Sequence, residues 1–88
     1  MSEGISIEYL DQTIRHRLEA THVEIIDTSG GCGQAFEVVI VSNIFLGKNK
    51  LLRHRMVNRA LRDEIMSIHA FTQKDYTPEE WARLTQHF

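Results

Sequence analysis

Apolar residues near the N-terminus recur at the spacing of a helix. Four of them follow one another at steps of three and four residues, on one helical face: Ile7, Leu10, Ile14 and Leu18. Ser6 stands just before this stripe, and serine is a residue type that caps helix N-termini. We therefore predict a helix over residues 7–20 whose apolar face packs on the rest of the protein.

Two β-rich segments follow this helix. Residues 22–26 (HVEII) are rich in β-branched side chains, and residues 35–42 (AFEVVIVS) have the pattern of a second strand. Alternation places three apolar residues of the second strand on one face: Phe36, Val38 and Ile40. Because the glycine-rich segment 27–34 connects the two segments, we predict a hairpin with a long loop.

A second helical pattern covers residues 50–65, after a break at Gly47. Its apolar side is drawn from six residues: Leu52, Met56, Val57, Ala60, Leu61 and Ile65. Three arginines mark the opposite, solvent-facing side: Arg55, Arg59 and Arg62. We expect this helix to cover the sheet.

The C-terminal part of the chain predicts one more strand and one more helix. Residues 67–73 (SIHAFTQ) have strand composition. Thr77 is placed to cap the following helix, with Pro78 in its first turn and Glu80 as the reciprocal capping partner. We expect Trp81 and Leu84 to anchor this helix on the domain.

The order of predicted elements is helix, strand, strand, helix, strand, helix (αββαβα). Strands and helices mix without a regular βαβ repeat, which indicates an α+β fold with one small sheet covered by helices. A chain of 88 residues is long enough for one domain. We expect a single domain over residues 1–88, with residues 1–5 and 86–88 frayed.

The net charge of −2 conceals an uneven distribution. Residues 47–62 hold six basic side chains and no acid, whereas the rest of the chain holds four basic and twelve acidic ones. We therefore expect one positive face on an otherwise negative surface, which bears on the choice of partners.

The single cysteine and the N-terminal segment indicate the compartment. One cysteine forms no internal disulfide, and small secreted domains usually depend on several, which favours a reducing environment. No apolar run approaches the roughly 20 residues that cross a bilayer, and the N-terminus lacks the pattern of a signal peptide. We expect a cytoplasmic protein, small enough to reach the nucleus, with no membrane partner.

Cys32 lies among three glycines in the segment DTSGGCGQ, where a packing cysteine is not expected. Glycines accept positive φ and add no bulk, so we expect the loop to be flexible and the thiol accessible. The residues alone leave two interpretations open: a metal ligand or redox thiol, or a free cysteine without a role. A thiolate suits iron–sulfur clusters, zinc or copper, and one cysteine needs further ligands for any of them.

Five histidines are present, and most of them have ordinary interpretations. His16 belongs to the polar side of the first helix and His87 to the chain end, so we expect both in solvent. His54 lies between two arginines, where packing is the favoured role over phosphate contact. His69 follows Ile68 near the start of the predicted third strand, and from its position alone a hydrogen-bonded structural role outweighs a ligand role.

Catalytic and metal motifs with standard spacing do not occur. The chain has no CxxC, HExxH, GxGxxG or GxxxxGK[ST] pattern, and no defensible Ser-His-Asp or Cys-His arrangement. The glycines of residues 30–33 lead into a strand and not a helix, so they form a poor phosphate cradle. An enzyme is the weakest hypothesis, and we expect none.

Three blocks in combination resemble the BolA family. They are Phe45-Leu46-Gly47-Lys48, the segment LRHRMVN at residues 52–58, and IHAFT at residues 68–72. The loop cysteine and the segment TPEEW at residues 77–81 are similar to the cytosolic eukaryotic branch that partners monothiol glutaredoxins. The resemblance runs from Tyr9 to about Arg83.

The resemblance implies both a fold and a function. The fold is like that of class II KH domains, a three-stranded sheet with helices on one side. The function is that of a heterodimer with a monothiol glutaredoxin, sharing a [2Fe–2S] cluster that the glutaredoxin's cysteine and glutathione also bind. Such a protein acts in iron sensing and in cluster assembly or transfer, with an iron-responsive regulator as a further partner.

The family's metal-binding positions match two residues of this chain. The histidine of the IHAF segment corresponds to His69, and the loop cysteine, a second contact, to Cys32. The resemblance therefore makes His69 the leading metal ligand despite the weaker case from its position alone. Whether Cys32 binds iron directly or only lies near it stays open.

Nucleic acid is the alternative ligand, because KH-like folds bind single strands and some bacterial BolA proteins bind DNA. The KH domain's GxxG loop lies between helices, whereas residues 30–33 of this chain lie between strands. Basic residues available for phosphate or for a partner are Lys48, Lys50, Arg53, His54, Arg55 and Arg59. We favour a solvated helix face that docks a partner and do not expect nucleic acid.

Overall fold

The α+β architecture predicted from the sequence is confirmed in a computed structural model, which describes residues 4–86. The elements in chain order are α1 (Ile7–Arg17), β1 (Ala20–Asp27), β2 (Ala35–Ser42), the 3-10 helix η1 (Asn43–Phe45), α2 (Lys50–Ala60), α3 (Arg62–Met66), β3 (Ala70–Tyr76) and α4 (Pro78–Thr85). Within the described residues, no helix is long and apolar enough to span a membrane.

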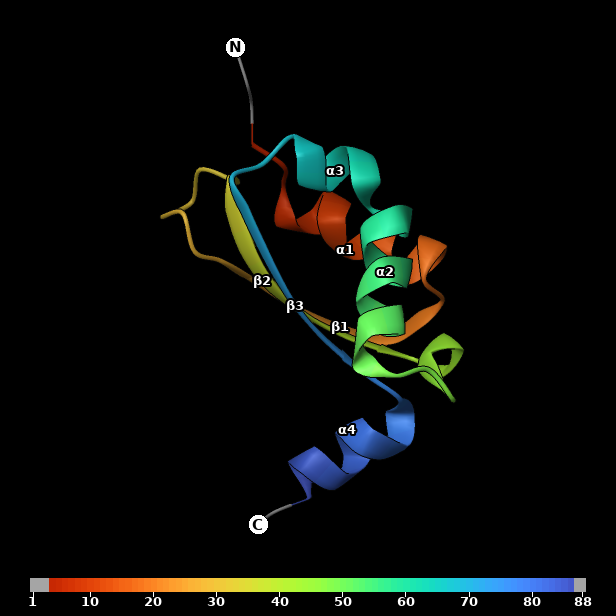
Figure 1. The fold of residues 1–88 in the computed structure, drawn as a ribbon. Helices are drawn as coiled ribbons and strands as arrows, with labels where there is room; N and C mark the ends of the chain where they lie inside the picture. The colour runs from red at the N-terminus through yellow and green to blue at the C-terminus, as the bar shows by residue number, and fades with distance from the viewer. Residues whose placement is uncertain (1–3, 87–88) are drawn as a thin grey trace.

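The three strands form one mixed sheet in the order β1-β2-β3. β1 and β2 pair antiparallel as the predicted hairpin, and β3 pairs parallel to β2 with Ala35 opposite Ala70. A parallel pair needs a crossover between its strands, and α2 and α3 provide it. Figure 1 shows α1, α2 and α3 together on one face of the sheet, with α4 beyond its far end.

The core lies between this helical layer and the sheet. It contains apolar side chains from α1 to α2: Leu10, Ile14, Leu18, Phe36, Val38, Ile40, Phe45, Val57 and Leu61. The predicted stripe on α1 is correct except for Ile7, which is 42% exposed. On the second helix, Leu52 is exposed and Val57 and Leu61 are fully buried, so the buried face centres on Val57.

The predicted helix over residues 50–65 is two helices that meet at Leu61. Leu61 ends α2 with its N–H donated to the Val57 carbonyl, and α3 starts at Arg62 and turns away from the direction of α2 (Figure 1). Because the helix axis changes here, the apolar residues of this segment do not share one continuous face. This is the reason that the predicted stripe from Leu52 to Ile65 is wrong in detail.

The third strand begins later than the sequence predicts, at Ala70 in place of Ser67. The N–H groups of Ser67 and Ile68 bond to the carbonyls of Glu64 and Ile65, so these residues continue the end of α3. His69 therefore lies in the turn before β3 and not inside the strand. At the start of the strand, Ala70 is exposed and Phe71 is half-buried.

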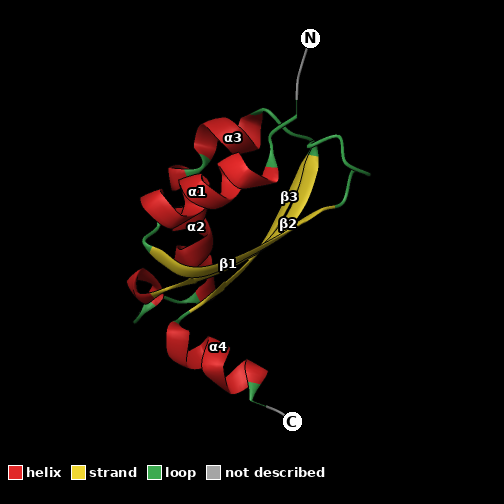
Figure 2. Ribbon diagram, turned by 180° about the vertical axis from the view of Figure 1, so that it is seen from behind, coloured by secondary structure: helices red, strands yellow, loops and turns green. Residues whose placement is uncertain are grey.

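Helix α4 begins with the predicted capping box. The Thr77 hydroxyl accepts from the Glu80 N–H at 3.2 Å, and the Glu80 carboxylate accepts from the Thr77 N–H at 2.9 Å. Trp81 then stacks on the His22 ring, with centroids 5.3 Å apart, and lies 5.6 Å from Tyr76. His22 and Tyr76 flank Val41 on the sheet face opposite the core, so Trp81 anchors α4 at one end of this second face. Figure 2 shows α4 at that end of the sheet, apart from α1, α2 and α3. Leu84, the other expected anchor, is 49% exposed.

Candidate functional site

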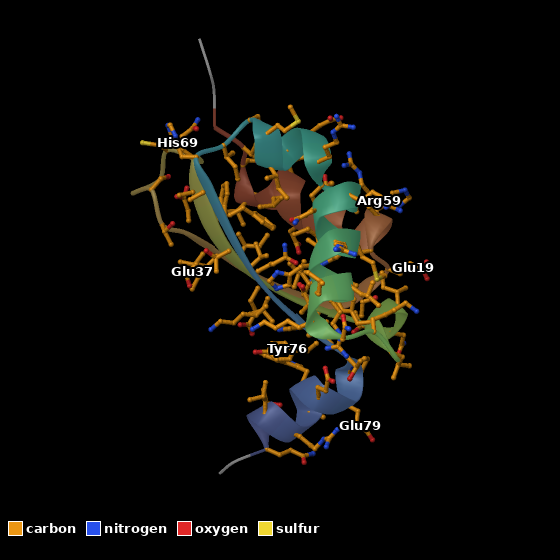
Figure 3. All side chains as sticks on the ribbon, in the orientation of Figure 1. Glu19, Glu37, Arg59, His69, Tyr76 and Glu79 are labelled. Carbon is orange, nitrogen blue, oxygen red and sulfur yellow. The ribbon has the colours of Figure 1, made fainter. Side chains whose placement is uncertain are left out.

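Strand pairing brings the two predicted metal-binding residues to the same end of the sheet. Cys32 lies in the β1–β2 loop, and His69 directly precedes β3. The carbonyl oxygen of Gln34 accepts from the His69 N–H at 2.7 Å and from the Ala70 N–H at 3.2 Å. Figure 3 shows His69 beside this loop, at the opposite end of the sheet from Tyr76 and α4.

Both side chains are accessible in the form that metal binding requires. His69 is exposed, and its ring makes no hydrogen bond to any residue within positions 4–86. Cys32 is exposed and is a free thiol. An imidazole with both nitrogens uncommitted and a thiol are donor types that iron–sulfur clusters accept.

The β1–β2 loop is organised around one carboxylate. Asp27 Oδ1 accepts from the Ser29 N–H at 2.8 Å and the Ser29 hydroxyl at 2.6 Å, and Oδ2 accepts from the Gly33 N–H at 3.0 Å. The Ser29 hydroxyl and then the backbone N–H groups hold the pKa of Asp27 below its ordinary value. The loop expected to be a flexible arm is thus anchored at both ends around Cys32.

The segment before α1 crosses this loop at close range. The Ile5 N–H donates to the Gly33 carbonyl at 3.0 Å, and a Cβ on Gly4 would lie 1.9 Å from the Cys32 carbonyl oxygen. Only glycine at position 4 allows this approach. The expected fraying of residues 1–5 therefore does not extend to Ile5, which also packs against the core. Residues 1–3, His87 and residue 88 lie outside the described residues.

The chain by itself supplies too few donors for a complete metal site. Within residues 4–86, no group of three or more His, Cys, Asp or Glu side chains gathers at metal-binding geometry. A [2Fe–2S] cluster takes four protein or thiol ligands. His69 and Cys32 fit such a cluster by donor chemistry as a partial set that other molecules would have to complete.

A basic cleft of about 910 Å³ lies at the other end of the molecule, between the start of α2, β3 and α4. Its basic lining residues come from four segments: Lys48, Lys50, Arg53, His54, Lys74 and Arg83. Lys74 and Arg83 were missed by the sequence analysis because only the fold brings them next to residues 48–54. Arg55 and Arg59, which the sequence grouped with these residues, are exposed on α2 and do not line the cleft.

Two of the predicted contact residues are already engaged with acids in this cleft. Arg53 donates to the two carboxylate oxygens of Glu80 at 2.7 and 3.2 Å. These hydrogen bonds, together with the one that Glu80 accepts from the Thr77 N–H, lower the pKa of Glu80 to about 2. His54 Nε2 lies 3.9 Å from Asp75 Oδ2. Arg83 also pairs with Glu79 at 3.4 Å, so among residues 4–86 the lysines are the lining cations without an ion pair.

Asp75 is a buried acid that the sequence analysis did not single out. Its side chain is only 1% exposed, and burial raises its pKa to about 6, although the Arg53 guanidinium favours the charged form. Asp75 stands opposite Ile40 in the sheet, on the strand face that carries the core. The alternation of Phe71, Gln73 and Asp75 along the strand is the signal that could have identified it.

Comparison with known proteins places this chain among relatives. A family model described as BolA-like protein matches residues 14–80. The human protein named BolA-like protein 2 is 48% identical over 83 residues, covering 93% of this chain and 96% of that protein.

Two solved structures share the fold over nearly the whole chain. The crystal structure of a bol-like protein from Babesia bovis has a TM-score of 0.82 at 41% identity, covering 93% of this chain and 95% of that one. The solution structure of yeast Fra2 has a TM-score of 0.75 at 41% identity, covering 96% and 95%. The similarity therefore includes both ends of the sheet.

Proposed function

Since the chain belongs to the BolA-like family, we propose that it is a non-enzymatic iron–sulfur partner of a monothiol glutaredoxin. The two proteins form a heterodimer that shares a [2Fe–2S] cluster. The observation that supports this most directly is the exposed His69 imidazole, with both nitrogens uncommitted, beside the loop that carries Cys32.

The ligand count explains why a partner is needed. His69 and Cys32 offer at most two of four ligands, and neither has a third donor of this chain next to it in residues 4–86. The glutaredoxin's active-site cysteine and the thiolate of glutathione complete the set. Cys32 is either a direct ligand or a neighbour that shields the cluster.

The imidazole of His69 determines how firmly this chain holds its share of the cluster. A neutral imidazole adds no negative charge, so the reduction potential is higher than with thiolates alone. Thiolates are the ligands that iron–sulfur clusters prefer, so the imidazole is the more easily released member of the ligand set. Such a ligand suits iron sensing and cluster hand-over in the cytoplasm and nucleus, where an iron-responsive regulator receives the signal.

The test is assembly of the complex from purified components. Wild-type protein, a monothiol glutaredoxin, glutathione, ferrous iron and sulfide should yield a coloured heterodimer, followed by size-exclusion chromatography and visible circular dichroism. His69→Ala should alter the spectrum and shorten the cluster's lifetime, whereas His16→Ala, an exposed histidine on α1, should match wild type. A wild-type spectrum and lifetime in His69→Ala would refute the assignment.

The basic cleft favours a second candidate function, the binding of single-stranded nucleic acid. Lys48, Lys50 and Lys74 face one cavity from two separate parts of the chain, an arrangement that can follow a phosphate backbone. Asp75 and Glu80 in the same cleft oppose an anion, which is why this function ranks second.

Salt dependence separates the two candidates. If nucleic acid is bound in the cleft, the slope of log K against log salt should fall by about 0.7 for each lysine removed in Lys50→Ala and Lys74→Ala. Arg59→Ala is the matched control, because Arg59 lies on α2 outside the cleft. The cleft would be excluded as a nucleic-acid site if Arg59→Ala lowered the affinity and the salt slope as much as the lysine variants do. It would also be excluded if the wild type bound no oligonucleotide in 50 mM salt.

A further inference from the structure

Asp27 controls the geometry of the metal-binding end of the sheet. We infer that its carboxylate is a positioning residue that holds the loop of Cys32 and the backbone of His69 in the arrangement that a shared cluster requires. The inference rests on the proposed function for the role of these two donors. It assigns a role to a residue that itself touches neither donor side chain.

The first step is the loop itself. The two oxygens of Asp27 accept three hydrogen bonds, from the Ser29 N–H, the Ser29 hydroxyl and the Gly33 N–H. Ser29 and Gly33 enclose Cys32 on both sides along the chain, and Gly33 follows it directly. The position of the cysteine backbone is therefore set by a carboxylate at the end of β1.

The second step connects the loop to His69. The Ser29 hydroxyl, oriented by Asp27, accepts from the Gln34 N–H at 3.2 Å. The Gln34 carbonyl in turn accepts from the His69 N–H at 2.7 Å. A continuous series of hydrogen bonds thus runs from the Asp27 carboxylate through Ser29 and Gln34 to the backbone of His69.

A carboxylate is chemically suited to this position. Ionised Asp accepts on both oxygens, whereas Asn accepts on only one atom and would point an N–H₂ group at one set of donors. The loop also holds Gly30, Gly31 and Gly33 at φ of 79°, 96° and 70°. Glycines lose much conformational freedom on ordering, so hydrogen bonds donated to a fixed acceptor are needed to select one loop conformation.

The experiment uses the full chain with two substitutions, Asp27→Ala and Asp27→Asn. Asp63→Ala is the matched control, because Asp63 is exposed on α3 and makes no side-chain hydrogen bond within the described residues. The first readout is amide hydrogen exchange in the free protein, resolved by NMR. In Asp27→Ala, the Gly33, Gln34 and His69 amides should exchange about 10-fold faster relative to the Ile40 amide, and in the control they should not.

The second readout is the complex with glutaredoxin. Asp27→Ala should shorten the cluster's lifetime about 10-fold and change the visible circular dichroism, as loss of an outer support for metal ligands typically does. Asp27→Asn should show smaller changes in the lifetime and in the spectrum than Asp27→Ala, since asparagine keeps one acceptor. If the substitution only destabilised the whole fold, the Ile40 amide would exchange faster as well, and the spectrum of the remaining complex would be unchanged.

The two proposals fail in different ways. If the wild type assembles a His69-dependent cluster and Asp27→Ala gives the same spectrum, lifetime and exchange rates, the role of Asp27 is overturned and the proposed function stands. If the wild type assembles no cluster, the proposed function falls. The exchange rates of the free protein then still test whether Asp27 holds the loop. If Asp27→Ala has wild-type exchange rates, the role of Asp27 is overturned too.

Discussion

The Gln34 carbonyl oxygen accepts the His69 N–H at 2.7 Å, although 35 positions separate the two residues in the chain. This contact stands one residue before the first parallel pair of β2 and β3, Ala35 with Ala70. It fixes the backbone of His69 against the glycine loop while its ring stays exposed. The site is thus built by the start of the strand pairing and not by the loop alone.

Replacement of Cys32 by serine should have a milder effect than the loss of His69. A serine hydroxyl is a poor iron ligand, but in the proposed complex the glutaredoxin and glutathione would still supply thiolates, so the cluster should form with a shorter lifetime. Lifetime and visible circular dichroism of the Cys32→Ser complex are the measurements, with His69→Ala in parallel. If Cys32→Ser abolished the protein–protein complex itself, the ranking of the two residues would be reversed.

Asp75 should lower stability at neutral pH, and its replacement by asparagine should raise it. The folded-state pKa of about 6 lies above the ordinary value of 3.8, so the folded protein favours the protonated acid. The folded protein therefore has its full stability below about pH 4, where Asp75 is protonated, and loses stability as the pH rises through 6 and the buried acid ionises. Asp75→Asn should therefore raise the unfolding free energy by about 1 kcal/mol at pH 7.5.

Urea unfolding of wild type and Asp75→Asn between pH 4 and pH 8 measures this difference. The difference in unfolding free energy between the two proteins should grow as the pH rises. Asp63→Asn, at an exposed position, should have the stability of the wild type at every pH. An Asp75→Asn protein that is less stable than wild type at pH 7.5 would mean that the attraction of Arg53 outweighs burial.

Glu64 should be a principal support of the helical layer. It is 7% exposed and accepts from the Tyr9 hydroxyl at 2.7 Å and from Arg17 at 2.9 Å, which joins α3 to α1. Burial would raise the pKa of Glu64, and the hydrogen bonds from Tyr9 and Arg17 more than offset it, so its pKa lies below the ordinary value. Glu64→Ala should lower the unfolding free energy by about 2 kcal/mol.

The pH dependence of this loss has a definite sign. A lowered acid pKa gives stability that is present above pH 4.5 and lost as the pH falls further, so the deficit of Glu64→Ala should shrink in acid. Urea titrations at pH 3.5 and pH 7 measure it, with Glu64→Gln as the variant that keeps one acceptor. A deficit below about 0.5 kcal/mol at pH 7 would place Glu64 among ordinary surface residues.

Arg53 should hold α4 in place through Glu80. Its hydrogen bonds are the largest cause of the low pKa of Glu80, about 2, and without them this pKa should return toward the ordinary value of 4.5. An NMR titration of Glu80 in Arg53→Ala measures the change, with Arg55→Ala as control. The stability that the pair provides is present above pH 4.5 and decreases as the pH falls toward 2. An unchanged Glu80 titration in Arg53→Ala would assign its low pKa to the capping box.

Local patterns in the chain were sufficient for the element order and for several element ends. Residues 35–42 alternate over a whole strand, and the observed β2 has those bounds. Ser6 and Thr77 cap their helices as their positions predict, because capping depends on residues three positions apart. The break at Leu61 and the late start of β3 were not predictable in this way, since both result from packing of the crossover on the sheet.

What the sequence by itself determined is therefore the α+β class and the order of strands and helices, whereas the metal-binding roles of His69 and Cys32 stay predictions. Only the tertiary structure decided that Asp27, Gln34 and His69 form one hydrogen-bonded series, and that Asp75 is buried. The physical reason is distance along the chain. Periodicity and capping act over a few residues, whereas the pairing of β2 with β3 joins positions about 35 apart and exists only once the sheet has formed.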